Sequence, residues 1–325
     1  MPRLILVPLD GSAFSAAALP AAAAIARRHR AAVHLVSVFT PLLAPLPFAG
    51  APERDERLDE EQRAALGRAL RRHADRLRDE AGISVTWATV DGDPDDALIA
   101  EAKATGADLI VLTSHGAGGF ERAWLGSVAD ALVRRAPAPV LIIRPDGAPS
   151  SDTASGAALR SGDGDAYRFA RVLVPLDGSA LAEEALAAAV ELSGGERTTF
   201  LLLRVVPVPH TIALEEETFW MPREEAAIEA ARATAASYLE GVASGLRAAG
   251  HQVEIVAVLD HDPARAVLRE AAERGAELIA VSTHGRTGFA RLRLGSVADK
   301  VVRASPCPTL VARPAAAADG APASR

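Results

Sequence analysis

The sequence predicts an α/β protein built from two tandem open parallel five-stranded sheets, each in the order 3-2-1-4-5 with helices on both faces. Short runs of Val, Ile and Leu alternate with longer helical stretches along the chain. This alternation is typical of strands that are buried on both faces and joined by right-handed crossovers. The same alternation occurs a second time within the 325 residues. We therefore expect two domains of one fold.

The expected elements follow in a regular order. In the first copy, the apolar runs that predict strands lie at 3–9, 33–39, 84–90, 108–113 and 139–144. The helical stretches between them lie at 13–29, 55–81, 94–105 and 126–136. Pro20 lies inside the first of these helices, so we expect a kink or a later start there. The strands of the second copy are expected at 171–176, 200–206, 252–258, 277–282 and 308–313.

Two long motifs carry the repeat. The string LILVPLDGS at 4–12 returns as VLVPLDGS at 172–179. The string HGAGGFERAWLGSVAD at 115–130 returns as HGRTGFARLRLGSVAD at 284–299. A duplication of this length predicts two related structural units rather than one large domain.

The composition between and after the copies sets the domain limits. The segment 146–167 is rich in Gly, Ser, Ala and Asp and is expected to be a flexible linker. The first domain is therefore expected at 1–145 and the second at 168–314. The remaining residues, 315–325, are expected to form a disordered tail.

Charge and cysteine content exclude several functions. The net charge of −7 argues against a broad basic surface for nucleic acid. Cys307 is the single cysteine, which fits a reducing, cytoplasmic setting. The apolar run before Asp10 is too short for a signal peptide, and no stretch reaches the roughly 20 apolar residues of a membrane span. We expect a cytoplasmic protein that binds neither nucleic acid nor membranes.

Known catalytic and metal-binding signatures are missing from the sequence. The eight histidines follow no metal-ligand spacing. The chain has no P-loop signature and no nucleophile elbow. We therefore assign no catalytic residue and no metal ligand.

Two loops of each copy are expected to flank one crevice, because ligands of open parallel sheets bind beyond the strand ends where the strand order reverses. In the first copy, Asp10 follows the first strand and Thr113 ends the fourth. Gly116 allows a close backbone approach, and Gly126-Ser127 open a helix whose N–H groups and positive partial charge suit a phosphate. The carboxylate suits the donors of a base or ribose. The equivalent residues of the second copy are Asp177, Ser282, Gly285, Gly295 and Ser296.

A simpler interpretation of these motifs remains open at this point. Ser127 and Ser296 also fit as ordinary helix N-caps, and the glycines also fit as turn residues. The presence of two such loops at one expected crevice favours the anion site.

These motifs resemble the universal stress protein family in its tandem form, over both copies but not the linker or tail. The nucleotide-binding subgroup of that family carries the pattern G-x2-G-x9-G-[ST]. Its last three elements are matched here twice, by Gly116, Gly126 and Ser127 and by Gly285, Gly295 and Ser296. Thr113 and Ser282 replace the first glycine.

The resemblance implies an adenine nucleotide alpha hydrolase-like fold that binds ATP, alone or with Mg²⁺. It assigns the adenine and ribose end of the ligand to Asp10, Val38, Asp177 and Val205. The matched glycines and serines would hold the phosphates. His115 and His284 match a position that is often His in the family, and we assign them to binding and not to catalysis.

The two copies differ in charge. Arg286, Arg291 and Arg293 follow only the second His-Gly pair. Because a polyphosphate is attracted by positive charge, we expect tighter ATP binding in the second copy.

The fifth strands, 140–144 and 309–313, are expected at sheet edges. An apolar edge strand is an aggregation hazard unless it is covered. Pairing of the two edges within the chain would cover both and make an intrachain pseudo-dimer, as the resemblance also implies. A further homodimer is compatible with this arrangement.

Three functions are consistent with the sequence. The first is a regulatory stress-response protein that binds ATP and is not an enzyme. The second is a slow ATPase or nucleotidyl-transfer enzyme that uses the same crevice. The third is a partner-binding stress protein without nucleotide. Since no general base and no metal-binding carboxylate set accompanies the loops, we favour the first.

Overall fold

The computed structural model describes residues 1–41, 56–114, 125–144, 167–193, 198–207, 222–283 and 294–312. The described residues up to Arg144, together with Tyr167, form one compact unit. Those from Arg168 onward form a second. Apart from Tyr167, the expected linker lies outside the described residues, and so does the expected tail.

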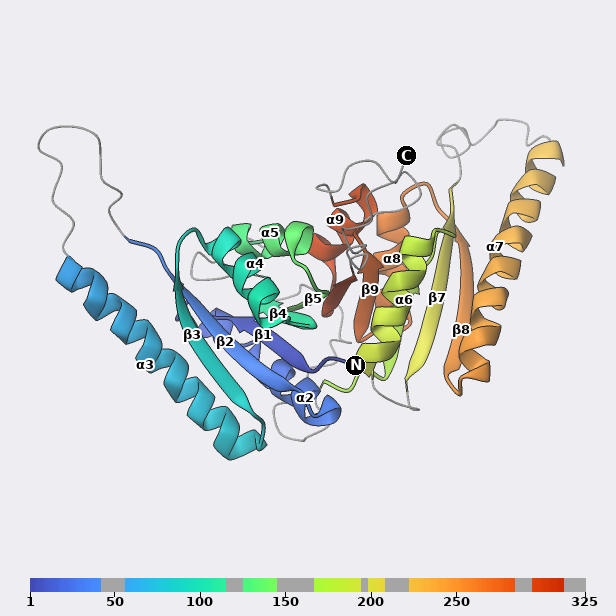
Figure 1. Cartoon of the computed structure of the whole chain (residues 1–325). Helices are drawn as coiled ribbons and strands as arrows, with labels where there is room; N and C mark the ends of the chain where they lie inside the picture. Colours follow the sequence, from blue (N-terminus) through green and yellow to red (C-terminus); the bar gives the residue numbers. More distant parts are fainter. Residues whose placement is uncertain are drawn as a thin grey trace, which may run out of the picture. The chain divides into compact units, whose positions relative to one another are not determined.

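The first unit alternates strands and helices as the sequence predicts (Figure 1). Its strands are β1 (Leu4–Pro8), β2 (Ala32–Phe39), β3 (Val85–Asp91), β4 (Leu109–Thr113) and β5 (Val140–Ile143). Its helices are α1 (Ala13–Ala16), α2 (Leu19–His29), α3 (Glu56–Ala81), α4 (Pro94–Thr105) and α5 (Ser127–Arg135). The strands are parallel and lie in the order β3-β2-β1-β4-β5. The predicted order 3-2-1-4-5 is confirmed.

The second unit has the same plan. Its strands are β6 (Arg171–Pro175), β7 (Thr199–Val206), β8 (Gln252–Leu259), β9 (Leu278–Ser282) and β10 (Thr309–Ala312). Its helices are α6 (Ala180–Ser193), α7 (Pro222–Ala248), α8 (Pro263–Glu273) and α9 (Ser296–Ala304). The strands are again parallel, in the order β8-β7-β6-β9-β10.

Helices cover both faces of each sheet. In the first unit α2 packs beside α3, and α4 packs beside α5. In the second unit α8 packs beside α9, while α6 and α7 pack on the strands. The central strands are uninterrupted apolar runs because both of their faces are covered; Ile5, Leu6, Leu173 and Val174 are fully buried. Within the described ranges, no helix combines the length and the apolar character needed to cross a bilayer.

The first helix differs from the prediction. We expected one helix at 13–29, and the structure has two, α1 and α2. Pro20 lies in the first turn of α2, where its missing N–H breaks no intrahelical hydrogen bond. Of the two outcomes expected for Pro20, the later helix start is the one observed.

Replacing two glycines by alanine is expected to change the stability in opposite directions. Gly106 ends α4 at φ +66, whereas Gly241 lies inside α7, and a Cβ on either would meet no atom within 4 Å. Gly106→Ala is expected to lower the free energy of unfolding by about 1 kcal/mol, because an L side chain is strained in the left-handed region. Gly241→Ala is expected to raise it by roughly 0.5–1 kcal/mol, because alanine favours a helix interior.

Urea unfolding followed by circular dichroism measures both variants. A shift in the same direction for the two substitutions would contradict the backbone argument.

Candidate functional site

The first strand of each sheet ends earlier than its neighbour. Pro175 is the last residue of β6 and pairs with Leu203 of β7, and the Leu176 N–H donates to the Leu203 carbonyl at 2.8 Å. β7 continues to Val206 beyond this point. The first unit repeats the arrangement, since Pro8 pairs with Val36 and β2 continues to Phe39. The end of the second strand in each unit therefore extends past the strand beside it.

An aspartate shapes the loop that follows each short strand. Asp177 Oδ1 accepts hydrogen bonds from the Ser179 N–H at 3.0 Å and from its hydroxyl at 2.6 Å. Asp10 Oδ1 accepts the same pair from Ser12, at 2.9 and 2.6 Å. These side chains mimic a backbone turn. Each carboxylate is thereby held at the end of its strand.

Glycine, and not serine, caps the helix that begins beside this loop. Gly126 is the N-cap of α5 and Gly295 is the N-cap of α9, and neither makes a side-chain capping bond. Ser127 and Ser296 are the first helical residues, so the N-cap interpretation of the serines is wrong. Because a glycine cap has no side-chain acceptor, it leaves the first N–H groups of the helix for another partner.

Each of these helix starts is tied to the end of a strand. The Gly126 N–H donates to the Ser114 carbonyl at 2.9 Å, and the Gly295 N–H donates to the Thr283 carbonyl at 2.7 Å. Thr113 and Ser282, at the predicted first-glycine positions, are the residues just before. Four predicted site residues and three arginines lie outside the described residues: His115, Gly116, His284, Gly285, Arg286, Arg291 and Arg293.

In the second unit the described site residues surround one pocket. Its volume is about 580 Å³, within the usual range for small-molecule sites. Five predicted residues line it, namely Asp177, Val205, Ser282, Gly295 and Ser296. The other walls are mainly apolar and come from β6, β7, β9 and all four helices of the unit. The sequence motifs therefore meet at one place, although their binding role stays a prediction.

The first unit holds its described site residues at equivalent positions. Asp10 follows β1, Val38 lies near the end of β2, and Thr113 ends β4. Gly126 and Ser127 begin α5.

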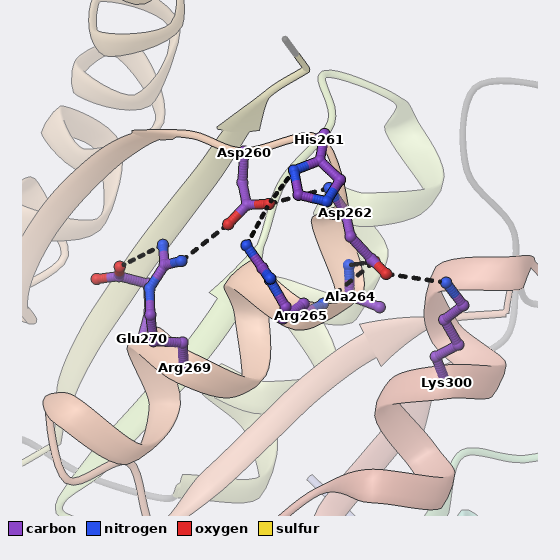
Figure 2. A network of polar contacts seen from close by, with 8 residues as sticks. All are labelled: Asp260, His261, Asp262, Ala264, Arg265, Arg269, Glu270 and Lys300. Atoms are coloured by element: carbon purple, nitrogen blue, oxygen red, sulfur yellow. Dashed lines mark hydrogen bonds and ion pairs between the residues drawn. The ribbon is translucent and has the colours of Figure 1, made fainter. Parts of the chain in front are cut away.

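A network of charged side chains fixes the loop between β8 and α8 (Figure 2). Asp260 is only 6% exposed. It accepts hydrogen bonds from the Asp262 N–H at 3.0 Å and from Arg269 at 2.8 Å. Arg265 and His261 approach it to 3.6 and 3.5 Å. The buried carboxylate is thus surrounded by positive or donor groups.

Asp262 links this loop to α9, the helix that begins at Ser296. Its side chain caps α8 by accepting from the Ala264 N–H at 3.0 Å, and it also binds the Lys300 ammonium of α9 at 3.1 Å (Figure 2). Pro263 and Val267 of α8 line the pocket. The network therefore holds one wall of the pocket against α9.

The environment lowers both carboxyl pKa values. Burial by itself raises the pKa of Asp260, but hydrogen bonds from the Asp262 N–H and Arg269 outweigh it, so the pKa falls below its ordinary 3.8. The hydrogen bond from Lys300 is the main cause that lowers the pKa of Asp262. Both side chains are therefore charged near neutral pH.

The same loop of the first unit is more acidic. It carries four aspartates, Asp91, Asp93, Asp95 and Asp96. Burial and the neighbouring Asp93 raise the pKa of Asp95. The positions of Arg265 and Arg269 in the second unit correspond to Asp96 and Ala100 in the first. Positive charge beside the site is therefore greater in the second unit.

Sequence reasoning missed several residues at this pocket. Arg204 and Pro263 line it, and Lys300 reaches its wall through Asp262. One signal was present, because Arg204 interrupts the apolar run of β7 where the first copy has Ser37. The repeated Asp-Pro pair was a second signal, since it begins α4 and α8.

Comparison with known proteins identifies the family. The sequence signature of the universal stress protein family matches residues 1–144 and again residues 168–313. The chain belongs to the universal stress protein family. The universal stress protein Rv2005c of Mycobacterium tuberculosis is 29% identical over 322 residues, which cover 95% of this chain and 96% of the relative. This universal stress protein therefore has the tandem form.

Two further comparisons bear on the domains and the fold. The universal stress protein YxiE of Bacillus subtilis is 30% identical over 153 residues, which are 45% of this chain and 99% of the relative. One repeat thus corresponds to a whole single-domain universal stress protein. The crystal structure of a universal stress protein from Archaeoglobus fulgidus has a TM-score of 0.66 at 22% identity and covers 96% of this chain and 98% of its own. The expected nucleotide alpha hydrolase-like fold is confirmed.

The Asp260 network gives a pH-dependent prediction. Asp260→Asn is expected to lower the free energy of unfolding at pH 7 by about 2 kcal/mol, because charge-assisted hydrogen bonds to a buried carboxylate are lost. Since the folded-state pKa of Asp260 is lowered, its contribution is present above 3.8 and is lost as pH falls through the folded value. The difference in the free energy of unfolding between Asp260→Asn and the wild type should therefore be smaller at pH 3.

Urea unfolding at pH 7 and pH 3 measures this gap. Asp91→Asn is the matched control in the first domain, where the side chain is 63% exposed and a change below about 1 kcal/mol is expected. An equal difference in the free energy of unfolding at both pH values would rule out the electrostatic explanation.

Proposed function

We propose that this chain is a cytoplasmic tandem universal stress protein that binds ATP beyond the carboxyl ends of its strands and acts as a nucleotide-dependent stress-response regulator. One observation carries the proposal. The residues that the two repeated motifs single out in the second domain, Asp177, Val205, Gly295 and Ser296 among them, line a single pocket.

The β6–β7 side of the pocket suits a nucleoside. Asp177 offers a carboxylate beside the strand end, and Val205 lies on the part of β7 that extends past β6. Leu203, Val267 and Val281 supply apolar surface for the faces of a base. A mainly apolar pocket with a few placed polar groups is the usual form of a small-molecule site.

The α9 side suits the phosphates. Gly295 and Ser296 begin α9 without a side-chain cap, so the N–H groups and the positive end of the helix dipole favour an anion. The Ser296 hydroxyl adds a further donor. Mg²⁺ enters the proposal only as a companion of the nucleotide.

The second domain is proposed to bind ATP more tightly than the first. Its β8–α8 region carries Arg265 and Arg269 where the first domain has an aspartate-rich loop, and Lys300 of α9 lies against this region through Asp262. A polyphosphate is attracted more strongly by the basic surroundings in the second domain than by the acidic loop of the first domain. The domain limits at 145 and 168, the pairing of the fifth strands into an intrachain pseudo-dimer, and a homodimer stay predictions.

Isothermal titration with ATP tests the two sites separately. Gly126→Val and Gly295→Val each add a branched side chain where a phosphate would approach backbone. We expect both to weaken binding, with a loss of tenfold or more for the tighter site in Gly295→Val. Equal losses in the two variants would contradict the asymmetry.

A test of the nucleotide itself accompanies this titration. Protein purified from cells is heated and the released small molecules are identified by absorbance and chromatography. Bound nucleotide, or an ATP-dependent rise in the melting temperature, is the expected result. If neither is observed, the chain acts as a nucleotide-free, partner-binding protein and the proposal fails.

Enzymatic turnover is not part of the proposed function. Asp177 Oδ1 already accepts two hydrogen bonds from Ser179, which suits a residue that shapes a loop better than a general base. Incubation with Mg·ATP is therefore expected to give no steady phosphate release above that of Asp177→Asn and Ser296→Ala. Turnover that either substitution abolishes would instead favour the slow ATPase or nucleotidyl-transfer function.

A further inference from the structure

One positive side chain of the pocket has no place in the ATP site described so far. Arg204 lies near the end of β7 and lines the pocket together with Asp177. It is half-buried and follows four fully buried residues, Phe200 to Leu203. An arginine at the end of such an apolar strand costs burial energy unless its charge finds a partner.

The guanidinium of Arg204 is held in a fixed position. Its central carbon lies 4.9 Å from the centroid of the Tyr238 ring on α7, a cation–π contact. The Tyr238 hydroxyl in turn donates to Glu183 of α6 at 2.8 Å. On the loop side, a Cβ on Gly178 would lie only 2.9 Å from Arg204 Nη1. The guanidinium therefore rests between an aromatic ring and the loop that carries Asp177.

No carboxylate neutralises this arginine within the part of the chain that the structure describes. Its guanidinium lies over the Tyr238 ring, and among the described residues no carboxylate oxygen lies within 4.0 Å of its nitrogens. A guanidinium that is half-buried, positioned and without an ion pair to any described carboxylate is suited to an anion on the ligand.

The place of Arg204 separates it from the proposed phosphate site. β6 lies between β7 and β9 in the sheet. Neighbouring strands are about 4.8 Å apart, so the end of β7 is about 10 Å from that of β9, where α9 begins. The 5′-phosphates at Gly295 and Ser296 therefore leave Arg204 beside the nucleoside. In dinucleotide sites an acidic residue meets the ribose hydroxyls, and a nearby arginine accommodates a phosphate on the ribose.

The first domain lacks this feature. Ser37 is the residue after Val36, which pairs with Pro8, just as Arg204 is the residue after Leu203, which pairs with Pro175. The Ser37 hydroxyl donates to the Leu9 carbonyl and is buried. The two domains are therefore expected to differ in ligand and not only in affinity.

We propose that Arg204 makes the second domain selective for an adenine nucleotide that carries a phosphate on its ribose, at the 2′ or 3′ position, in addition to its 5′-phosphate. This selectivity rests on the proposed nucleotide site and adds a second anion to its ligand.

Isothermal titration of the full chain with three probes tests the selectivity. The probes are AMP, adenosine 2′,5′-bisphosphate and adenosine 3′,5′-bisphosphate. At least one bisphosphate is expected to bind tenfold or more tightly than AMP, since one charge-assisted hydrogen-bonding pair accounts for such a factor. The preferred bisphosphate tells the 2′ position from the 3′ position.

Two variants assign the preference to Arg204. In Arg204→Ser, which installs the first domain's residue, the ratio of bisphosphate to AMP affinity is expected to fall toward one. Arg204→Lys keeps the charge without the planar fork and is expected to retain part of the ratio. If Arg204 only holds α7 through Tyr238, Arg204→Ser will instead lower the melting temperature and weaken all three probes by the same factor.

Three outcomes overturn the inference. Binding of AMP without any preference for a bisphosphate rejects it and leaves the nucleotide site intact, and so does a preference that survives in Arg204→Ser. If neither AMP nor ATP nor either bisphosphate binds the wild-type chain, the proposed function fails and the selectivity fails with it.

Discussion

The strand order reverses between β1 and β4 of the first domain and between β6 and β9 of the second. At this point β6 is followed by α6, which packs on β9 and β10, whereas α9, which follows β9, packs beside α8. β6 also ends early, at Pro175, while β7 continues to Val206 beside it. The pocket of the second domain lies there.

Two kinds of helix start meet beside this pocket. α8 begins with Asp262 and Pro263, and the aspartate side chain accepts from the first free N–H groups. α9 begins with Gly295, which offers no such acceptor. An aspartate cap neutralises the positive end of a helix, whereas a glycine cap leaves it for an external anion. The aspartate cap therefore makes the start of α8 a structural feature, whereas the glycine cap makes the start of α9 a candidate binding site.

The two domains share their backbone plan and differ in their charged side chains. Both have the aspartate turn, the glycine-capped helix and the early end of the first strand. In the second domain Arg204 occupies the position of Ser37 in the first domain, and arginines surround Asp260. A duplicated fold retains the contacts that shape the loops, while positions at the rim tolerate new charges because solvent still reaches them. We infer that the copies have separate roles.

The sequence by itself determined the strands and the two repeats, because buried parallel strands need continuous apolar runs. Its loop motifs also singled out five of the residues that line the candidate pocket. It also singled out Asp177 and Gly295 before their positions were known. Only the tertiary structure decided that glycine and not serine caps α9, since a cap depends on backbone angles that both residues adopt. The candidate role of Arg204 likewise depends on the tertiary structure, which brings Tyr238, Gly178 and Asp177 close to it from segments that are distant in sequence. The local sequence pattern encodes which residues are buried and the spacing of apolar residues along each element. The neighbours of a charged side chain, by contrast, are set by the packing between elements.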